Sequence, residues 1–344
     1  MKIKIISTVF IGLFLGLFCQ ASLAADLVLN FSGGAAGDAV KKYFVENFEK
    51  ATGKKVIFEA GANFAKLRAM VKSGNVEWDL AEATSQDLVI LGEKEGLLEP
   101  IDYNIINKTG IYEEALHPYG VGKAFYSTVM AYNTANYPKG KQPRNWKDFW
   151  DVAKFPGFRS LQNDPFNNLE FALMADGVPF DKLYPLDMDR AFRSLDKIKP
   201  HIKVWWTAGA QPAQLLTDKE VDMVSAWNGR IYAIQKQGAP VEIEWNQGML
   251  QFSNWVVPKG APNKKLAMEF IQFTHQPKLQ AEYAEFVGYP GLSKKAFEFI
   301  KQEFAQNLPT YPEHYKKQVV VNYKWWFENR DKVQEKWNVW IMKK

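Results

Sequence analysis

The sequence predicts an α/β fold, because short apolar strands alternate with amphipathic helices along most of its 344 residues. Most of these strands end in a polar loop that often carries glycine, and open α/β sheets bind ligands at the carboxyl ends of their strands. Two strands, near residues 130 and 253, are interpreted as crossings between two lobes. The sequence therefore predicts one cleft shared by many loops.

The chain opens with a strand–loop–helix–strand unit. An apolar strand over 27–29 leads into the glycine-rich loop Ser32, Gly33, Gly34. A helix with apolar positions from 40 to 51 follows, Gly53 ends it, and a strand covers 55–58. Free backbone N–H groups at such a helix start favour anionic or acceptor groups on a ligand, although a turn that contacts no ligand has the same pattern.

A second unit repeats this order. The predicted helix within 61–74 precedes a strand at 78–80, and the next helix covers 86–95. Thr84 and Ser85 lie just before that helix, where a hydroxyl either caps the helix or faces a ligand.

The second lobe begins after a strand over 124–133, whose β-branched and aromatic residues alternate with others. Asp164 lies in a turn just before a helix over 168–174, so its carboxylate is near a helix start. Trp206 ends a strand over 200–206, and Gln211 belongs to the next loop. The remaining predicted elements are the helices 145–151, 187–198, 212–216, 231–237, 264–274, 277–287 and 319–342, and the strands 221–227, 243–245 and 251–258.

The N-terminus has the pattern of a secretory signal peptide. Lys2 and Lys4 precede an apolar run over 9–18, and the small residues Ser22 and Ala24 follow at cleavage spacing. A membrane anchor is the alternative, but the run is shorter than the ~20 residues that a span needs. We expect cleavage near Ala24 and a periplasmic location. The predicted organisation is a signal peptide over 1–24, a first lobe over 25–130 and 255–344, and a second lobe over 131–254.

Composition excludes several classes of protein. The one cysteine, Cys19, lies in the signal peptide, so we expect neither a disulfide scaffold nor a thiolate metal site. The formal charge is +5 with no Lys/Arg block of five or more, and nucleic acid is therefore not an expected partner. The 24 Phe, 14 Tyr and 12 Trp residues predict that aromatic rings line part of the cleft.

Motifs for catalysis are absent. Metalloprotease, P-loop, dinucleotide and G-x-S-x-G patterns do not occur, and the four histidines are too far apart in sequence for metal-ligand spacing. We expect no cofactor, no metal and no enzyme activity. An exported hydrolase that uses cleft carboxylates such as Glu82 and Asp164 stays an alternative, as does a ligand sensor.

Three motifs carry a family resemblance: the segment EGLLEPID over 95–102, WNG over 227–229 and GYP over 288–290. With them the chain resembles the extracellular solute-binding proteins of ABC importers, specifically the spermidine/putrescine-binding family. The resemblance implies a two-lobed periplasmic-binding-protein fold, type II-like, with two crossing hinge strands. It also implies a monomer that closes on a small-molecule ligand and delivers it to a permease in the inner membrane.

The resemblance also implies a binding site. The matching positions are Ser32, Gly33, Thr84, Ser85, Asp164, Asn167, Trp227, Gln251, Ser253 and Tyr289. Polyamine binders have an aromatic residue in the first loop, an acidic residue near Asn167, and Trp and Asp on the crossing strand. This chain has Ser32, Asn167, Gln251 and Ser253 in those places.

Losing two carboxylates removes the partners that would hold two separate ammonium groups. A solute with one amine and one anionic end is therefore favoured over a polyamine. In this hypothesis Asp164 holds the amine, and Trp227 and Trp206 form a cation–π or apolar wall. The loop backbone over 32–34, the loop over 207–211 and Arg230 meet the carboxylate. Arg230 could equally be a surface ion-pair residue, and Trp206 a core ring. The lobes are expected to close about hinges near Ala131 and Asn254.

Overall fold

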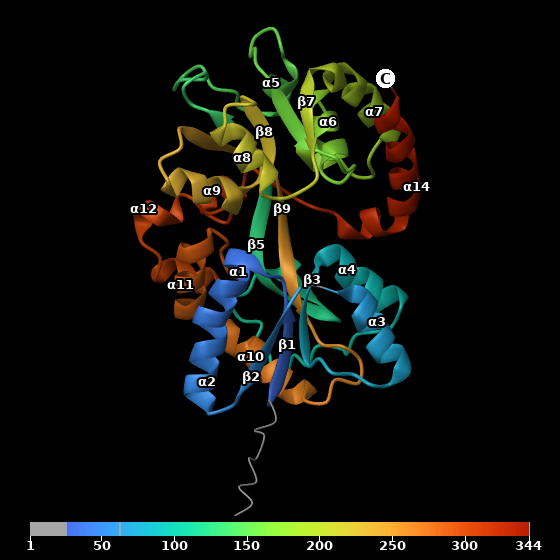
Figure 1. Cartoon of the computed structure of the whole chain (residues 1–344), viewed down its shortest axis with the longest axis vertical. Helices are drawn as coiled ribbons and strands as arrows, with labels where there is room; N and C mark the ends of the chain where they lie inside the picture. Colours follow the sequence, from blue (N-terminus) through green and yellow to red (C-terminus); the bar gives the residue numbers. More distant parts are fainter. Residues whose placement is uncertain (1–25, 62, 344) are drawn as a thin grey trace, which may run out of the picture.

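The computed structural model describes residues 26–61 and 63–343, so the predicted signal peptide lies outside the described residues. The fold has two lobes joined by long strands (Figure 1). One sheet runs through both lobes in the order β2-β1-β3-β9-β5-β8-β6-β7, with β10 beside β9 and β4 beside β5. The strands are β1 (Leu27–Phe31), β2 (Val56–Ala60), β3 (Leu80–Thr84), β4 (Leu116–His117), β5 (Gly120–Asn133), β6 (Arg159–Gln162), β7 (Ile202–Trp206), β8 (Met223–Trp227), β9 (Val241–Val256) and β10 (Val319–Val320).

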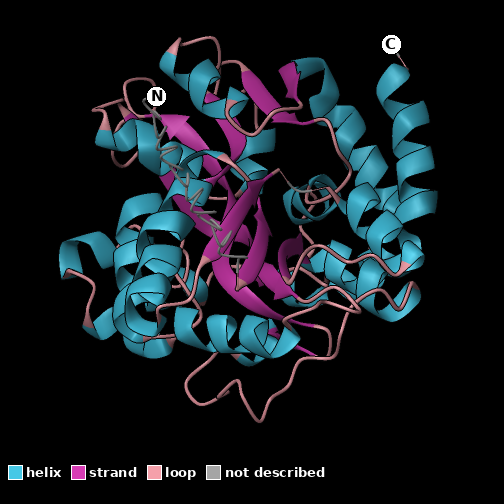
Figure 2. Ribbon diagram, turned by 60° about the horizontal axis from the view of Figure 1, so that its bottom comes forward, coloured by secondary structure: helices cyan, strands magenta, loops and turns pink. Residues whose placement is uncertain are grey.

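Helices cover the sheet on both faces (Figure 2). Those of the first lobe include α1 (Gly34–Ala39), α2 (Glu46–Thr52), α3 (Phe64–Ser73), α4 (Ser85–Val89), α10 (Lys264–Thr274) and α11 (Pro277–Val287). Those of the second lobe include α5 (Trp146–Trp150), α6 (Asn168–Ala175), α7 (Met188–Ile198), α8 (Gln211–Thr217) and α9 (Asn228–Lys236). The C-terminal part adds α12 (Gln302–Ala305), α13 (Pro312–Tyr315) and α14 (Tyr323–Met342).

Local sequence explains several helix boundaries. Gly53 and Gly74 close α2 and α3 in the left-handed conformation, with φ values of 73° and 74°. The Thr84 side chain accepts a hydrogen bond from the backbone N–H of Asp87 and so caps α4, as predicted. Because β1 and β3 pair in parallel, the polar loops that follow them lie at the same edge of the sheet.

The strands β5 and β9 pair antiparallel along their length and link the lobes. The sequence predicted two separate strands, 243–245 and 251–258, but β9 is one continuous strand. The prediction was wrong because residues 245–248 loop out of β9 between the pairs Thr128–Met249 and Met130–Glu244, with Gln247 at φ 64°. Asn254 pairs with Gly122 and Ala131 with Ile243, so the two predicted hinge positions are not opposite each other.

The C-terminal segment forms a third connection between the lobes. β10 pairs with β9 at Met249 and Leu250, and α14 then packs on the second lobe (Figure 1). Trp326 and Trp337 are buried in the hydrophobic cluster of that lobe. α14 also contacts α4 of the first lobe, so this helix, which the sequence predicted within the first lobe, lies against both lobes. The tryptophan-rich face of α14 shows only that the helix must be covered, and it does not say by which lobe.

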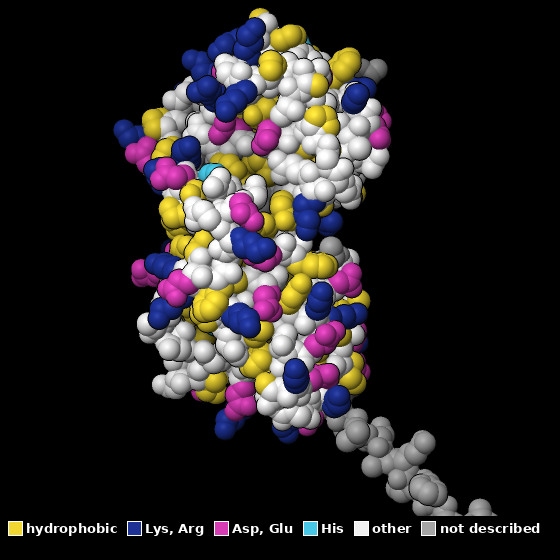
Figure 3. Space-filling view, turned by 90° about the vertical axis from the view of Figure 1, so that its left-hand side faces the viewer, with side chains coloured by type: hydrophobic (Ala, Val, Ile, Leu, Met, Phe, Trp, Pro, Cys, Tyr) yellow, Lys and Arg dark blue, Asp and Glu magenta, His cyan; other side chains and the backbone are white. Residues whose placement is uncertain are grey.

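Two large hydrophobic clusters form the cores, one in each lobe. Among the helices in the described part of the chain, none combines the length and the apolar character needed to cross a bilayer. The space-filling view shows a constriction at mid-height, between the lobes (Figure 3).

Candidate functional site

A cavity of about 280 Å³ lies between the lobes, at the ends of β1, β3 and β8. It brings together most of the predicted site residues, namely Ser32, Gly33, Thr84, Trp227, Arg230, Ser253 and Tyr289. It also includes Phe64, Glu82, Lys123 and Tyr126, which the prediction of ligand contacts did not contain. The volume is at the low end of the range for small-molecule sites.

The first-lobe wall of this cavity contains an ion pair. A carboxylate oxygen of Glu82 (Oε1) lies 2.9 Å from Lys123 Nζ, and Ser32 Oγ donates a 2.7 Å hydrogen bond to the other, Oε2. Lys123 Nζ also donates to the Tyr283 hydroxyl at 3.1 Å and lies 4.4 Å from the centre of the Phe31 ring. The wall is therefore polar but close to neutral.

Lys123 is almost completely buried, with 3% of its side chain exposed, and 12% of the Glu82 side chain is exposed. Burial alone disfavours the Lys123 ammonium, but the Glu82 carboxylate and the Tyr283 hydroxyl outweigh that effect and raise the pKa of Lys123. Lys123 is the one charged residue in the strand β5, and this pattern in the sequence indicates a buried cation that needs a partner.

The second-lobe wall consists of Trp227 and Arg230, which lie at the end of β8 and in the first turn of α9. The Arg230 side chain is exposed, and its guanidinium forms no hydrogen bond or ion pair with any other residue that the structure describes. The positive charge of Arg230 acts on the Tyr289 hydroxyl, although burial, the larger effect, raises the pKa of Tyr289 to about 12. This wall therefore presents a cation without an internal partner.

Aromatic rings line the space between the two walls. Tyr126 contacts Trp227 edge to face, with ring centres 6.4 Å apart, and Tyr289 in the same way at 6.2 Å. Trp206 is fully buried behind Trp227, with ring centres 6.0 Å apart, and its indole N–H donates to the Ser225 carbonyl. Trp206 is thus a core ring that supports the wall and does not line the cavity.

Ser85, Gln211 and Gly34 do not line the cavity either. Ser85 donates to the Phe252 carbonyl at 3.0 Å and accepts from Asn254, so its hydroxyl joins α4 to β9. Gln211 accepts a 3.1 Å hydrogen bond from the backbone N–H of Thr207 and closes its own loop. Gly34 begins α1 with φ 73°, a conformation that favours glycine.

Asp164 lies in a different cavity, of about 90 Å³, together with Gln86 and Arg330. Its carboxylate accepts a 2.8 Å hydrogen bond from the backbone N–H of Phe166. Burial raises the pKa of Asp164, against the opposing effects of that N–H and of Arg330. The two carboxylates that the hydrolase alternative gave as examples, Asp164 and Glu82, line different cavities.

Asn167 and Gln251, which stand where the polyamine binders have an acidic residue and a Trp, form a buried amide network. Both donate to the Thr128 hydroxyl, at 3.1 and 2.9 Å, and the Tyr126 hydroxyl donates to Gln251 Oε1 at 3.1 Å. Each amide is only 2% exposed. Their polar groups are therefore satisfied within the protein and do not line the cavity.

Two of the motifs that carried the family resemblance meet beside the cavity. Asn228 donates to the Gly288 carbonyl at 2.9 Å, and its side-chain oxygen accepts from the Ser127 N–H at 2.8 Å. A Cβ atom added at Gly229 would lie 2.5 Å from the Tyr289 ring, so only glycine allows this approach. These contacts hold the start of α9 against the loop that carries Tyr289.

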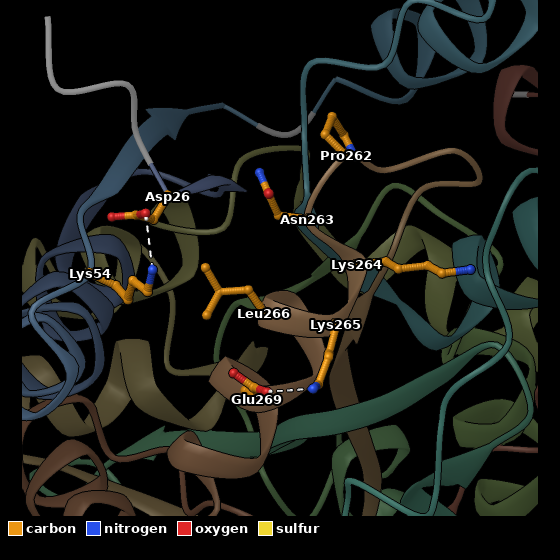
Figure 4. A pocket seen from close by; sticks show the side chains of 8 residues that line it. All are labelled: Asp26, Lys54, Pro262, Asn263, Lys264, Lys265, Leu266 and Glu269. Carbon is orange, nitrogen blue, oxygen red and sulfur yellow. Dashed lines mark hydrogen bonds and ion pairs between the residues drawn. The ribbon is translucent and has the colours of Figure 1, made fainter.

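Another concave area lies at the far end of the first lobe (Figure 4). It is open, and its charged side chains are paired: Lys54 with Asp26 at 3.3 Å, Lys265 with Glu269 at 3.9 Å, and Lys264 with Glu99, outside the lining, at 3.6 Å. Within residues 26–61 and 63–343, no group of three or more His, Cys, Asp or Glu side chains could hold a metal ion. The cavity between the lobes is thus the candidate site, suited to a solute that offers an anionic group to Arg230 and an apolar or cationic part to the rings.

Comparisons with known proteins agree with this geometry. The family model described as bacterial extracellular solute-binding protein matches residues 44–313. A γ-aminobutyric acid-binding protein of Pseudomonas aeruginosa is 35% identical, over 96% of this chain and 94% of that protein. The spermidine/putrescine-binding periplasmic protein of Escherichia coli is 24% identical, over 84% of this chain and 88% of that protein.

Among solved structures, an ABC transporter substrate-binding protein from Bradyrhizobium japonicum superposes with a TM-score of 0.87 at 41% identity, over 93% of this chain and all of that one. This similarity confirms the predicted two-lobed periplasmic-binding-protein fold. The chain therefore belongs to the bacterial extracellular solute-binding proteins and is the substrate-binding component of an ABC transporter.

Proposed function

We propose that this protein captures a small amino carboxylate of the γ-aminobutyrate type in the cavity between its lobes. The observation that carries the proposal is the Arg230 guanidinium, which faces an aromatic cavity without an internal partner. A guanidinium binds a carboxylate through two parallel hydrogen bonds, which fixes both its position and its orientation.

The amine end of such a ligand faces the opposite side of the cavity. The rings of Trp227 and Tyr126 attract a cation through their faces. Each oxygen of the Glu82 carboxylate has one partner, Lys123 or Ser32, and a carboxylate can accept about four hydrogen bonds. Glu82 thus keeps the capacity to accept from an ammonium group. Asp164, which was predicted to hold the amine, is replaced by Glu82 in this proposal.

A diamine fits this cavity less well than an amino carboxylate. Its second ammonium would face Arg230, and like charges in a desolvated site cost several kcal/mol. The buried amides Asn167 and Gln251 offer no compensating charge. The γ-aminobutyric acid-binding relative, at 35% identity, supports the same ligand class.

Capture is proposed to proceed by lobe closure. A ligand that contacts Arg230 on one lobe and Glu82 on the other favours the conformation in which both contacts form. The three connections, β5, β9 and the segment 319–322, would bend where β9 leaves its pairing with the first lobe. Export through the segment 1–24, cleavage near Ala24, a periplasmic location, a monomeric state and delivery to an inner-membrane permease are part of the same proposal.

Isothermal titration of the mature chain tests the ligand class. The ligands are 4-aminobutyrate, putrescine, butyrate and butylamine, which share a four-carbon backbone and differ in their charged ends. We expect 4-aminobutyrate to bind roughly 10- to 150-fold more tightly than either singly charged compound, since each lost charged contact costs about 1.5–3 kcal/mol. Tighter binding of putrescine than of 4-aminobutyrate would contradict the proposal.

A further inference from the structure

A second cavity, of about 420 Å³, adjoins the first. The two share Gly33, Ala36, Arg230 and Tyr289 in their linings, so they meet at Arg230. We call this second space the outer chamber. It lies between α9 of the second lobe and the first-lobe helices α1 and α11.

The outer chamber is positively charged. Arg230 and Lys236 line it, and no carboxylate does. Lys236 is exposed, forms no ion pair with another described residue, and holds its Nζ 5.4 Å from the centre of the Tyr232 ring. A further ammonium, that of Lys42, lies 5.7 Å from the centre of the Phe286 ring, which is also part of the lining. The rest of the lining is mainly apolar.

The walls of the outer chamber are held together by direct contacts. Asn228 is hydrogen-bonded to Gly288, and Tyr232 lies so close to Gly288 that an added Cβ atom there would be 2.9 Å from the ring. Phe304 packs against the other side of Tyr232, with ring centres 5.5 Å apart. The chamber is therefore a formed part of the site and not only a gap that appears when the lobes separate.

We propose that the inner cavity and the outer chamber form one elongated site, and that its substrates include amino dicarboxylates. This inference rests on the proposed function. The first carboxylate binds Arg230 with the amine inward, and the second carboxylate extends past Arg230 to Lys236. The inner cavity alone is at the low end of the volumes typical of ligand sites, and the two spaces together lie well within that range.

The test uses two matched probes on the mature chain. One is 4-amino-2-(2-carboxyethyl)butyrate, which is 4-aminobutyrate with a second carboxylate on a side chain. The other is 4-amino-2-(2-carbamoylethyl)butyrate, in which a neutral amide replaces that second carboxylate. By isothermal titration we expect the dicarboxylate to bind roughly five-fold more tightly than the amide, as suits an ion pair at an exposed site. The ratio should shrink in high salt.

Variants locate the effect. Lys236→Gln should abolish the preference for the dicarboxylate and leave the affinity for 4-aminobutyrate unchanged. Lys182→Gln, which removes an exposed lysine of the second lobe outside both cavities, should preserve the preference. Equal affinity for the two probes, or a preference that survives Lys236→Gln, would overturn this inference alone. Failure to bind 4-aminobutyrate would instead contradict the proposed function.

Discussion

The two walls of the cavity differ in whether their charged side chains are paired. In the first-lobe wall, Glu82 and Lys123 neutralise each other, and the neighbouring hydroxyls of Ser32 and Tyr283 complete the network. In the second-lobe wall, Arg230 has no partner among the described residues. The first lobe thus presents a nearly neutral surface, and in the binding mode that we propose the Arg230 guanidinium of the second lobe selects the ligand.

Burial accounts for this difference. A buried ammonium such as that of Lys123 must be paired, because an isolated buried charge is very costly. Arg230 is exposed to solvent, so water can satisfy its guanidinium until a ligand replaces that water. Substitutions that remove a charge from either wall should therefore have different effects.

The largest effect is expected from breaking the first-lobe pair. Lys123→Met leaves the Glu82 carboxylate without its cation and should lower the free energy of unfolding by about 3–5 kcal/mol in urea titrations. Adding Glu82→Gln to this variant should recover much of the loss. Arg230→Met should leave the free energy of unfolding within about 0.5 kcal/mol of the native value. Equal destabilisation by Lys123→Met and Arg230→Met would remove the contrast between the walls.

The second lobe also contains a buried carboxylate, Glu170. Its hydrogen-bond partners are neutral, whereas Glu82 in the first lobe is paired with a cation. Glu170 Oε1 accepts 2.6 Å hydrogen bonds from the Tyr184 hydroxyl and from the indole N–H of Trp326 in α14. Burial raises the pKa of Glu170 from 4.5 to about 7, against the lowering effect of these donors. Glu82, by contrast, has Lys123 beside it.

The raised pKa means that the folded state binds this proton more tightly than the unfolded state does. The contribution of Glu170 to stability is therefore lost as the pH rises from about 4.5 to about 7, by up to roughly 3 kcal/mol. Glu170→Gln should flatten this part of the pH profile of the unfolding free energy. A profile of Glu170→Gln that parallels the native one from pH 5 to pH 8 would be evidence against the assignment.

A smaller effect, on binding alone, is expected at Arg230. Arg230→Met should weaken 4-aminobutyrate binding by about 2 kcal/mol, or roughly thirty-fold, because the ligand carboxylate loses a charged hydrogen-bond donor. Arg230→Lys keeps the positive charge but not the two parallel donors of the guanidinium, so its affinity for 4-aminobutyrate should lie between those of the native chain and Arg230→Met. Isothermal titration gives all three affinities, and unchanged binding to Arg230→Met would show that the carboxylate binds elsewhere.

The smallest effect is expected at the aromatic part of the second-lobe wall. Trp227→Leu keeps an apolar surface but removes the ring face, and should weaken 4-aminobutyrate binding by about 1 kcal/mol. The affinity for butyrate, which has no ammonium, should change less. An equal loss for both ligands in titrations would indicate that Trp227 contributes apolar contact only.

The sequence predicted local features of the fold well. The bounds of α10 and α11 agree with the prediction, and in α11 the boundaries follow from Pro277 at its start and Gly288 after its end. The continuity of β9 was missed, since Gln247 interrupts the alternation where the strand loops out. The packing of α14 against the second-lobe cluster could not be predicted from the pattern of its own residues.

For the site, residues at strand ends were the predictable part. Ser32 and Thr84 follow or end parallel strands of the first lobe, and Trp227 ends a strand of the second lobe that runs in the opposite direction, so the carboxyl ends of strands from both lobes face the cavity. The pairing of Lys123 with Glu82 depends on which strands become neighbours, and residue spacing does not contain that information. Asp164, like Ser32, lies in a polar loop just after a strand, but it lines another cavity. The position of a residue after a strand predicts the edge of the sheet at which it lies, and it does not predict which cavity the side chain faces.

Charge reversal at Arg230 separates the contribution of the second lobe to ligand selection from that of the first. The measurement is the affinity of Arg230→Asp for 4-aminobutyrate and for putrescine, by isothermal titration at the same salt concentration as the native chain. If the second-lobe cation selects the ligand, this variant loses 4-aminobutyrate binding and prefers putrescine. An Arg230→Asp variant that still prefers 4-aminobutyrate would contradict the assignment of charge selection to the second lobe.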